Sequence, residues 1–329
     1  MTKRYFCTLF DKNYLIKGIA MLRSISSVSP GAFIWVLCLD DLTQKMIKSL
    51  EITGVIPISY AEIKTAQLDE IRSSRSTAEF CWTLSSYFTA YVMQNEKQID
   101  LLTYLDADLY FFSSVEPIFE ELEGVSIGVI EHRYTSHLLY LQVYGVYNVQ
   151  WVSFRRDTQG LQCLYVWRDQ CIEWCYSILE KDRFGDQKYL DYWPKIYDRF
   201  RAIKNVGAGL APWNYSNYKI EYDSEKILVD NSPLIFYHFH QFQILGPGEF
   251  NYCPHIYTAD GPPPTIIYSA YSSAISAELD GIREILPSFS YGIKNASALR
   301  FRRLVQALLP RSVKSLIHKL KSITQILSN

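Results

Sequence analysis

Short apolar runs alternate with segments of helical spacing over the first 130 residues. The apolar runs predict strands at 5–10, 33–39, 55–60, 100–105 and 126–130. Between them, apolar residues spaced by three and four positions predict helices at 14–27, 43–50, 68–73, 83–94 and 115–122. Near-continuous apolar strands alternating with helices are typical of a mostly parallel sheet that helices cover on both faces. We therefore expect an α/β fold with a doubly wound, Rossmann-like sheet.

The later part of the chain has a different pattern. Beyond about residue 145 we expect long helical stretches, the loop VGAGLAPWN and an aromatic strand in LIFYHFHQF. A proline-rich break at 261–264 precedes a mainly helical end. These changes predict a main domain at 1–250, a helical extension at 251–298 and a tail at 299–329.

Charge distinguishes the tail from the body. Lys and Arg number 33 against 34 Asp and Glu in the 329 residues, and this balance argues against general nucleic-acid binding. Residues 299–329 hold seven Lys or Arg and no acid, and their apolar residues after Pro310 repeat at three and four positions. Such a basic amphipathic helix favours an anionic membrane surface. Docking on the protein's own body or on a second copy remains an alternative.

Two further sequence features bear on location. The seven cysteines are an odd number, and the start MTKRYFCTLF lacks a signal-peptide core. No run of 18 or more apolar residues occurs, so no membrane-spanning helix is predicted. We expect a cytoplasmic protein that lies peripherally on the inner face of the cytoplasmic membrane.

The segment YLDADLYFF carries the strongest chemical signal. A buried strand runs directly into Asp106 and Asp108, and open α/β sheets bind ligands at the carboxyl ends of their strands. Two neighbouring carboxylates repel each other when buried, so the pair is best explained by a bound cation. This pattern predicts a site for a metal and a diphosphate.

Two other enzyme classes share parts of this pattern. Aspartyl-phosphate phosphatases also begin with strand-Asp-x-Asp, but that motif lies near the start of their chains. Gly124, Ser126 and Gly128 match a serine-hydrolase elbow, yet the expected helix precedes the serine and the strand follows it, the reverse of the required order. No glycine-rich dinucleotide loop follows a strand.

Other polar residues gain meaning beside the two aspartates. His238 and His240 are two positions apart on an expected strand, so both face one side, and imidazole suits Mn²⁺ or Zn²⁺ better than Mg²⁺. Asp186 and Gln187 open a helix-like run, where Asp186 serves either as an N-cap or in catalysis. Gly209 lies in a turn that a ligand can approach. Trp82 suits sugar recognition or core packing.

Seven segments in order resemble bacterial GT-A-fold glycosyltransferases of surface-polysaccharide synthesis. They are CTLFDKNYL, EFCWTLSSYF, YLDADLYFF, YNVQWVSFRRD, FGDQKYLDYWP, GAGLAPWN and FYHFHQF. More distantly, they are similar to the retaining family of glycogenin and the lipooligosaccharide galactosyltransferases. The resemblance covers about residues 4–250.

The resemblance implies roles for individual residues. Asp106 and Asp108 would hold Mn²⁺ or Mg²⁺ against the diphosphate, with His238 as a further metal ligand and His240 as the alternative. Asp186 and Gln187 would lie near the donor sugar and acceptor. The base and ribose would be bound by Thr8, Asp11 and Tyr14.

The chain departs from the family pattern at two places. Asn148 matches the Asn of an Asn-x-Gly segment, but Gln150 stands at the position of the glycine. A family lysine is replaced by Ala78, and Arg75 would supply the charge on the diphosphate instead.

The sequence thus predicts a metal-dependent glycosyltransferase. It would move a sugar from a nucleotide-diphosphate sugar, with a UDP-sugar favoured, to a glycan or lipid-linked acceptor, and the resemblance favours retention at the anomeric carbon. The alternative is a catalytically inactive protein that binds nucleotide sugars or carbohydrates.

Overall fold

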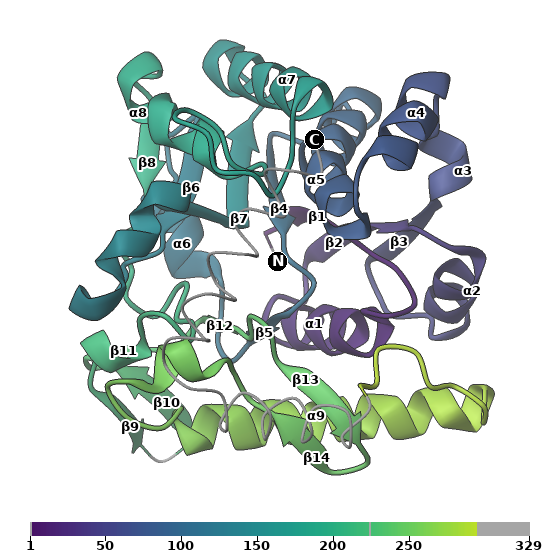
Figure 1. Ribbon diagram of the computed structural model, residues 1–329, viewed down its shortest axis with the longest axis vertical. Coiled ribbons are helices and arrows are strands. Elements are labelled where there is room, and N and C mark those ends of the chain that lie inside the picture. Colours follow the sequence, from purple (N-terminus) through teal and green to yellow (C-terminus); the bar gives the residue numbers. More distant parts are fainter. Residues whose placement is uncertain (1, 224, 295–329) are drawn as a thin grey trace, which may run out of the picture.

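The structure is a computed structural model that describes residues 2–223 and 225–294. Its centre is a twisted seven-stranded sheet with helices on both faces (Figure 1). The strand order within this sheet is β3-β2-β1-β4-β7-β6-β8. The strands span β1 (Arg4–Phe10), β2 (Ala32–Cys38), β3 (Val55–Ser59), β4 (Leu101–Leu105), β6 (Ile127–Glu131), β7 (Tyr147–Arg155) and β8 (Phe200–Ala202).

Parallel pairing dominates this sheet. The pairs β3–β2, β2–β1, β1–β4 and β6–β8 are parallel, while β7 runs antiparallel to both β4 and β6. The α/β, mostly parallel fold expected from the sequence is therefore confirmed. The apolar pattern of the sequence predicts no strand at β7, because Asn148, Gln150 and Ser153 interrupt its apolar run although all three are buried.

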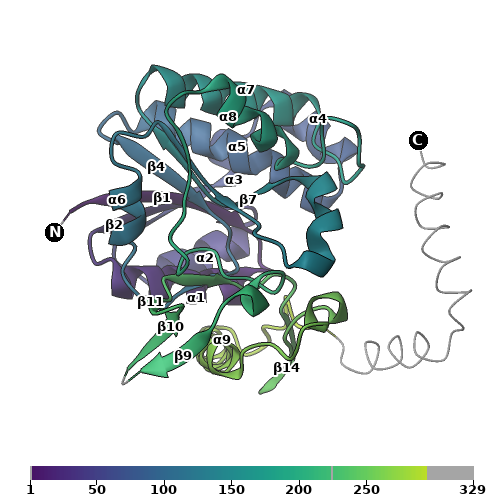
Figure 2. The ribbon, with the colours of Figure 1, turned by 90° about the vertical axis from the view of Figure 1, so that its left-hand side faces the viewer.

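Each face of the sheet has its own layer of helices (Figure 2). On one face α4 (Ala66–Ser74), α5 (Thr77–Asn95) and α7 (Thr158–Glu173) pack in one hydrophobic cluster. On the other face α1 (Leu15–Val28), α2 (Asp41–Ser49), α6 (Glu116–Glu121) and α9 (Thr265–Ile285) contribute to a second cluster. The strands between these layers are buried on both sides, and this explains their continuous apolar character.

Short polar side chains set where several of these helices begin. The Ser76 side chain accepts the Glu79 backbone N–H, and the Glu79 carboxylate accepts that of Ser76, which forms a capping box for α5. Asp157 caps α7 by accepting the Gly160 N–H at 2.9 Å. Asp40 caps α2 in the same way through Thr43. These caps satisfy backbone donors that a helix start leaves unpaired.

The second half of the chain adds small sheets below the main one. Strand β5 (Leu109–Phe111) pairs with β12 (Phe236–His238), and β13 (Gln243–Gly246) pairs with β14 (Glu249–Asn251). The third contains β9 (Ile220–Asp223), β10 (Lys226–Val229) and β11 (Ser232–Pro233). Short helices complete the connections: α3 (Tyr60–Ile63), α8 (Trp193–Ile196), η1 (Ser136–Tyr144), η2 (Lys188–Tyr192), η3 (Tyr215–Asn217) and η4 (His255–Thr258).

Helix α9, which the sequence analysis assigned to the extension at 251–298, packs against the main body. Its Tyr268, Tyr271 and Ile275 are buried in the same cluster as α1. The expected basic tail at 299–329 lies outside the described residues. Among the helices that the structure describes, none has both the length and the apolar character needed to cross a bilayer.

Candidate active site

The two aspartates lie where strand β4 ends. Strand β4 is almost entirely buried, and the Asp106 backbone N–H donates to the Gln150 carbonyl of β7 at 3.2 Å. Asp108 is buried just before β5 begins. The chain therefore turns between two fixed strands, and this turn places both carboxylates at the carboxyl edge of the central sheet.

His238 reaches the same place from a distant part of the sequence. Strand β12 pairs antiparallel with β5 so that His238 lies opposite Leu109. The Phe239 N–H donates to the Asp108 carbonyl at 2.9 Å, and the His238 N–H donates to the Leu210 carbonyl at 2.7 Å. Backbone pairing on both sides thus fixes the imidazole beside the carboxylates.

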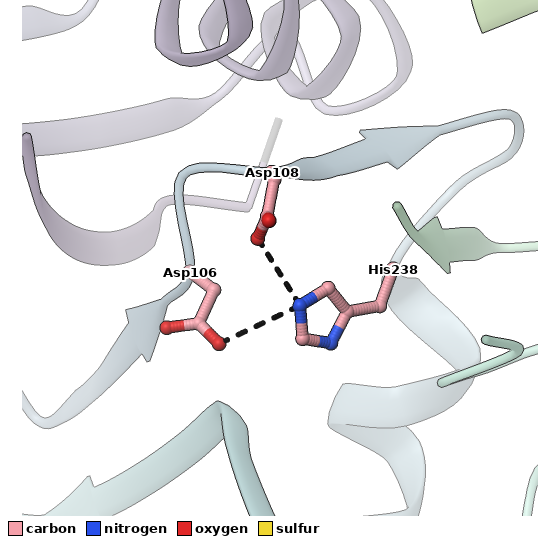
Figure 3. A group of neighbouring side chains, drawn as sticks. All are labelled: Asp106, Asp108 and His238. Atoms are coloured by element: carbon pink, nitrogen blue, oxygen red, sulfur yellow. Dashed lines mark ion pairs between the residues drawn. The ribbon is translucent and has the colours of Figure 1, made fainter. Parts of the chain in front are cut away.

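The three side chains point toward one another (Figure 3). The Nε2 atom of His238 lies 3.1 Å from Oδ1 of Asp108 and 3.9 Å from Oδ2 of Asp106. One ligand atom from each residue falls within 4.8 Å of the other two. Two carboxylate oxygens and one imidazole nitrogen form a donor set that suits Mn²⁺ and similar divalent cations.

Burial and the charges of neighbouring residues shift the pKa values of Asp106, Asp108 and His238 in different directions. Burial disfavours ionisation of both aspartates, but at Asp108 the charge and hydrogen bond of His238, together with the charges of Lys17 and His240, outweigh burial and hold the pKa of that carboxyl well below its usual value. For Asp106 burial prevails, and repulsion from Asp108 adds to it, so its pKa is raised. Burial also opposes the charged form of His238, but Asp108 and Asp106 outweigh it and raise the pKa of the imidazole. A cation would relieve the repulsion between the carboxylates.

His240 lies two residues beyond the end of β12. Its ring centroid is 5.7 Å from that of His238 and 5.4 Å from that of Trp213, so both histidines face the same tryptophan. Burial and the nearby His238 lower the pKa of His240 to about 4. His240 is not one of the three residues whose ligand atoms converge, and its role as the alternative ligand stays a prediction.

Asp186 is held by helix α5 and interacts electrostatically with Asp106. Its Oδ2 atom accepts the Ser85 hydroxyl at 2.8 Å, and its carbonyl accepts Nε1 of Trp167 at 2.9 Å. The preceding Gly185 adopts a φ of 52°, which directs the chain past the Trp82 ring. Burial and the negative charge of Asp106 raise the pKa of Asp186 to about 7. Electrostatic repulsion from Asp106 thus couples Asp186 to the pair of Asp106 and Asp108.

Gln187 is oriented by a different contact. Its Nε2 donates to the Tyr144 carbonyl at 3.0 Å, at the end of η1. The next residue begins η2. The pair of Asp186 and Gln187 is therefore attached to α5 by one side chain and to η1 by the other.

Of the residues expected at the nucleoside, Thr8 lies in β1, while Asp11 and Tyr14 lie in the turn between β1 and α1. The Thr8 hydroxyl is buried, and no hydrogen-bond partner for it occurs among the described residues. Asp11 accepts the backbone N–H groups of Asn13 at 2.9 Å and Tyr14 at 3.3 Å. The negative charge of Asp108, together with burial, raises the pKa of Tyr14 and identifies the phenol as a neighbour of the aspartate pair.

Arg75 is tied to carbonyl groups of the protein. Its guanidinium is buried and donates to the Thr83 hydroxyl, to the Cys171 carbonyl at 2.6 Å and to the Ile172 carbonyl at 2.7 Å. These bonds connect the start of α5 to the end of α7. These hydrogen bonds give the guanidinium a structural role. Binding of the diphosphate by Arg75 stays a prediction.

A buried polar network surrounds Asn148. His132 Nδ1 lies 3.1 Å from the Val146 carbonyl and therefore carries the proton, so Nε2 accepts the Asn148 amide at 2.9 Å. The Asn148 Oδ1 accepts the Gln150 N–H at 2.8 Å. Burial lowers the pKa of His132 to about 3, which keeps this acceptor neutral. His132 thus fixes the orientation of Asn148.

Gln150 has a carboxamide that forms no hydrogen bond with any residue that the structure describes. Both Nε2 and Oε1 are buried without a hydrogen bond among the described residues. A Cβ atom at Gly209, whose φ is 78°, would lie 3.1 Å from this Nε2 and 2.7 Å from Cγ2 of Ile130. Glycine is therefore required there by both backbone conformation and space.

Sequence reasoning missed Lys17, Ser85 and His132. Ser85 and His132 have no signal in a single sequence, because their partners come from other segments. Lys17 did have one, since it is a charged residue within the otherwise apolar stretch LIKGIAML. A lysine on the buried face of a helix needs a reason to be there.

The sequence of this chain is similar to a known protein family and to two proteins of Bacillus subtilis. Residues 7–152, which include both aspartates, match the family model described as glycosyl transferase family 8. The chain is 28% identical to the uncharacterized protein YfnD of Bacillus subtilis over 295 residues, covering 89% of this chain and 95% of that protein. It is also 28% identical to the uncharacterized protein YfnF of the same organism, covering 88% and 97%.

Solved structures with a similar fold are more distant in sequence. The galactosyltransferase LgtC in complex with donor and acceptor sugar analogues is 13% identical, covers 84% of this chain and 95% of its own, and has a TM-score of 0.48. Mouse xyloside xylosyltransferase 1 is 14% identical, covers 73% and 98%, and has a TM-score of 0.45. On the family match over residues 7–152, the chain is a glycosyltransferase distantly related to glycosyl transferase family 8.

Proposed function

We propose that this glycosyltransferase uses a nucleotide-diphosphate sugar, with UDP-sugars as the favoured class, and depends on Mn²⁺ or Mg²⁺. The observation that carries the proposal is the convergence of Asp106, Asp108 and His238 at the end of β4. Asp106 and Asp108 would hold the cation and His238 would complete its ligands. The cation, when bound, would neutralise charge on the diphosphate oxygens as a Lewis acid.

The transfer itself breaks one bond and forms another. The bond from the sugar C1 to the diphosphate oxygen breaks, and its electron pair stays on that oxygen. An acceptor hydroxyl oxygen bonds to C1, and its proton passes to the departing diphosphate oxygen. We propose that Asp186 and Gln187 lie beside the reacting sugar and the acceptor, and that the anomeric configuration is retained.

The remaining site residues would hold the donor. Thr8, Asp11 and Tyr14 would contact the base and ribose, and Asn148, Gly209 and Trp82 would contact the sugar. The Thr8 hydroxyl and the Gln150 carboxamide have no hydrogen-bond partner within residues 2–223 and 225–294, and this supports a polar ligand in this region, because buried polar groups are rarely left without a partner.

The acceptor and the location complete the proposal. We propose a glycan or lipid-linked acceptor in cell-surface polysaccharide synthesis, handled at the inner face of the cytoplasmic membrane. The basic, amphipathic pattern of residues 299–329 supports the location. Deletion of 299–329 should move the protein from the membrane fraction to the soluble fraction, and unchanged partitioning would refute this part.

The test of function is release of nucleoside diphosphate from UDP-, GDP- and CDP-sugars, with and without Mn²⁺. We expect one donor class to give metal-dependent release that is lost in Asp108→Asn. Donor binding, seen as thermal stabilisation, without release under any condition would instead identify an inactive nucleotide-sugar-binding protein. A variant at the exposed Asp198 serves as the control.

A further inference from the structure

Lys17 is a buried cation that has no ion-pair partner in the part of the chain that the structure describes. Its residue is 8% exposed, and its Nζ lies over the Tyr14 ring at 4.6 Å from the ring centroid. Removing an ammonium group from water is costly unless a negative group compensates it. The position therefore calls for an anion.

The packing of α1 on β5 places Lys17 alongside Asp108. The Phe111 N–H donates to the Ser24 hydroxyl at 3.1 Å, which fixes the helix against the strand. Lys17 precedes Ser24 by two helical turns, about 10 Å along the same face. Asp108 precedes Phe111 by three strand residues, also about 10 Å. The two elements thus bring the ammonium group to the level of the aspartate pair.

Electrostatic coupling agrees with this placement. The positive charge of Lys17 contributes to lowering the pKa of Asp108 and opposes protonation of His238 and His240. Burial is the main cause that lowers the pKa of Lys17 itself, with Asp108 acting in the opposite sense and Lys294 adding to the lowering. The backbone N–H of Lys294 donates to the Ile244 carbonyl at 2.7 Å, and this hydrogen bond fixes the backbone position of Lys294.

A diphosphate needs a cation here that Arg75 does not readily provide. The Arg75 guanidinium is occupied by the carbonyls of Cys171 and Ile172. Lys17 has no such commitment among the described residues. Its charge also interacts with Asp108, one of the two carboxylates that would hold the metal.

We propose that Lys17 binds the diphosphate of the donor from the side of α1, and this inference rests on the proposed function. The charge of Lys17 has opposite effects on two ligands. It repels a free divalent cation at Asp108, and it attracts a metal–nucleoside diphosphate complex, which remains an anion. The site is thereby selective for the complex over the metal alone.

The experiment is calorimetric titration of the full chain with Mn²⁺ alone, with UDP in saturating Mn²⁺, and with uridine. The variant is Lys17→Met, which keeps an unbranched side chain of similar length. We expect Mn²⁺ alone to bind severalfold more tightly, UDP–Mn²⁺ to bind at least tenfold more weakly, and uridine to bind as in the wild type. Arg23→Met removes an equal charge from the exposed side of the same helix and should change none of these.

The outcomes separate this inference from its alternatives. If Lys17 had only a structural role, Lys17→Met would either weaken the binding of uridine and UDP together or leave both unchanged. Either result overturns the proposal. Lys17→Arg, which keeps the charge, should retain most of the UDP affinity. If Lys17→Met fails to fold, the UDP affinity of Lys17→Arg tests the proposal instead. Failure of wild-type protein to bind any of UDP, GDP or CDP would refute the proposed function as well, whereas equal UDP affinity in wild type and Lys17→Met refutes this inference alone.

Discussion

The Nε2 atom of His238 lies 3.1 Å from Oδ1 of Asp108, although the two residues belong to opposite halves of the chain. The antiparallel pairing of β12 with β5 produces this contact, because it sets His238 opposite the residue that follows Asp108. A buried carboxylate and imidazole at this distance compensate each other's charge in the free protein. A bound cation would compete with the imidazole proton for the same nitrogen lone pair.

Replacement of Asp108 by asparagine should remove metal binding and transfer. The substitution takes away one of two carboxylate ligands and leaves His238 without its main charge partner. We expect the thermal stabilisation that Mn²⁺ gives the wild type to disappear and nucleoside diphosphate release to fall at least a hundredfold. Differential scanning fluorimetry and a coupled release assay measure the two effects. Wild-type turnover in Asp108→Asn would contradict the metal role.

Metal affinity should fall as the pH is lowered. Asp108 and Asp106 raise the pKa of His238 above its ordinary value, so the imidazole holds its proton to higher pH, and a metal must displace that proton. Below this pKa, the affinity for Mn²⁺ should fall by up to about tenfold per pH unit. Titration calorimetry in two buffers of different ionisation enthalpy detects the released proton. His238→Gln should flatten the profile, and an unchanged affinity of the wild type between pH 6 and pH 8 would exclude His238 as a ligand.

Asp186 should make the metal-free protein less stable as the pH rises. Its pKa is raised from 3.8 to about 7 by burial and by Asp106, so the folded state binds its proton more tightly than the unfolded state does. Stability from this proton is complete below about pH 4 and is lost as the pH rises through 7. Three pKa units correspond to at most about 4 kcal/mol.

Asparagine imitates the protonated form of Asp186 and can still accept the Ser85 hydroxyl. The free energy of unfolding of Asp186→Asn, relative to wild type, should therefore increase between pH 5 and pH 8 when measured with urea in chelator. Asp198→Asn, at an exposed position, is the matched control. A pH-independent difference would show that Asp186 ionises freely in the folded protein.

Gln150→Met should stabilise the free protein. The carboxamide of Gln150 is buried, and neither of its polar atoms has a hydrogen-bond partner in the described part of the chain. An unsatisfied buried polar group costs about 1–3 kcal/mol. Methionine fills a similar volume without polar atoms. We expect a higher melting temperature without ligand, together with weaker stabilisation by the donor. A lower melting temperature would mean that ordered water already satisfies the amide.

Gly209→Ala should destabilise the protein and weaken donor binding. The added Cβ atom would lie 2.7 Å from Ile130 Cγ2, on a backbone whose φ of 78° already disfavours a side chain. The cost should be about 1–3 kcal/mol in the free energy of unfolding. Gly246→Ala, where nothing lies within 4 Å of the new atom, is the control for a general loss of glycine. Equal stability of both variants would show that the loop at Gly209 shifts freely.

The sequence by itself determined the parallel part of the sheet and the position of Asp106 and Asp108. Continuous apolar strands alternating with helices are local patterns, and a strand that ends in two carboxylates needs no distant partner to be recognised. The same local character placed α1, α2 and α4 within two residues of their observed bounds, whereas the helix expected at 83–94 begins six residues after the start of α5. It did not identify β7, because polar residues that are satisfied only by the folded protein interrupt its apolar run.

Only the tertiary structure decided which side chains meet at those carboxylates. The pairing of β12 with β5 brings His238 within reach of Asp108, and the packing of α1 on β5 brings Lys17 to the same level. It also joined the guanidinium of Arg75 to carbonyls of α7. Such contacts depend on strand register and helix packing, which follow from the burial of the whole chain rather than from any one segment.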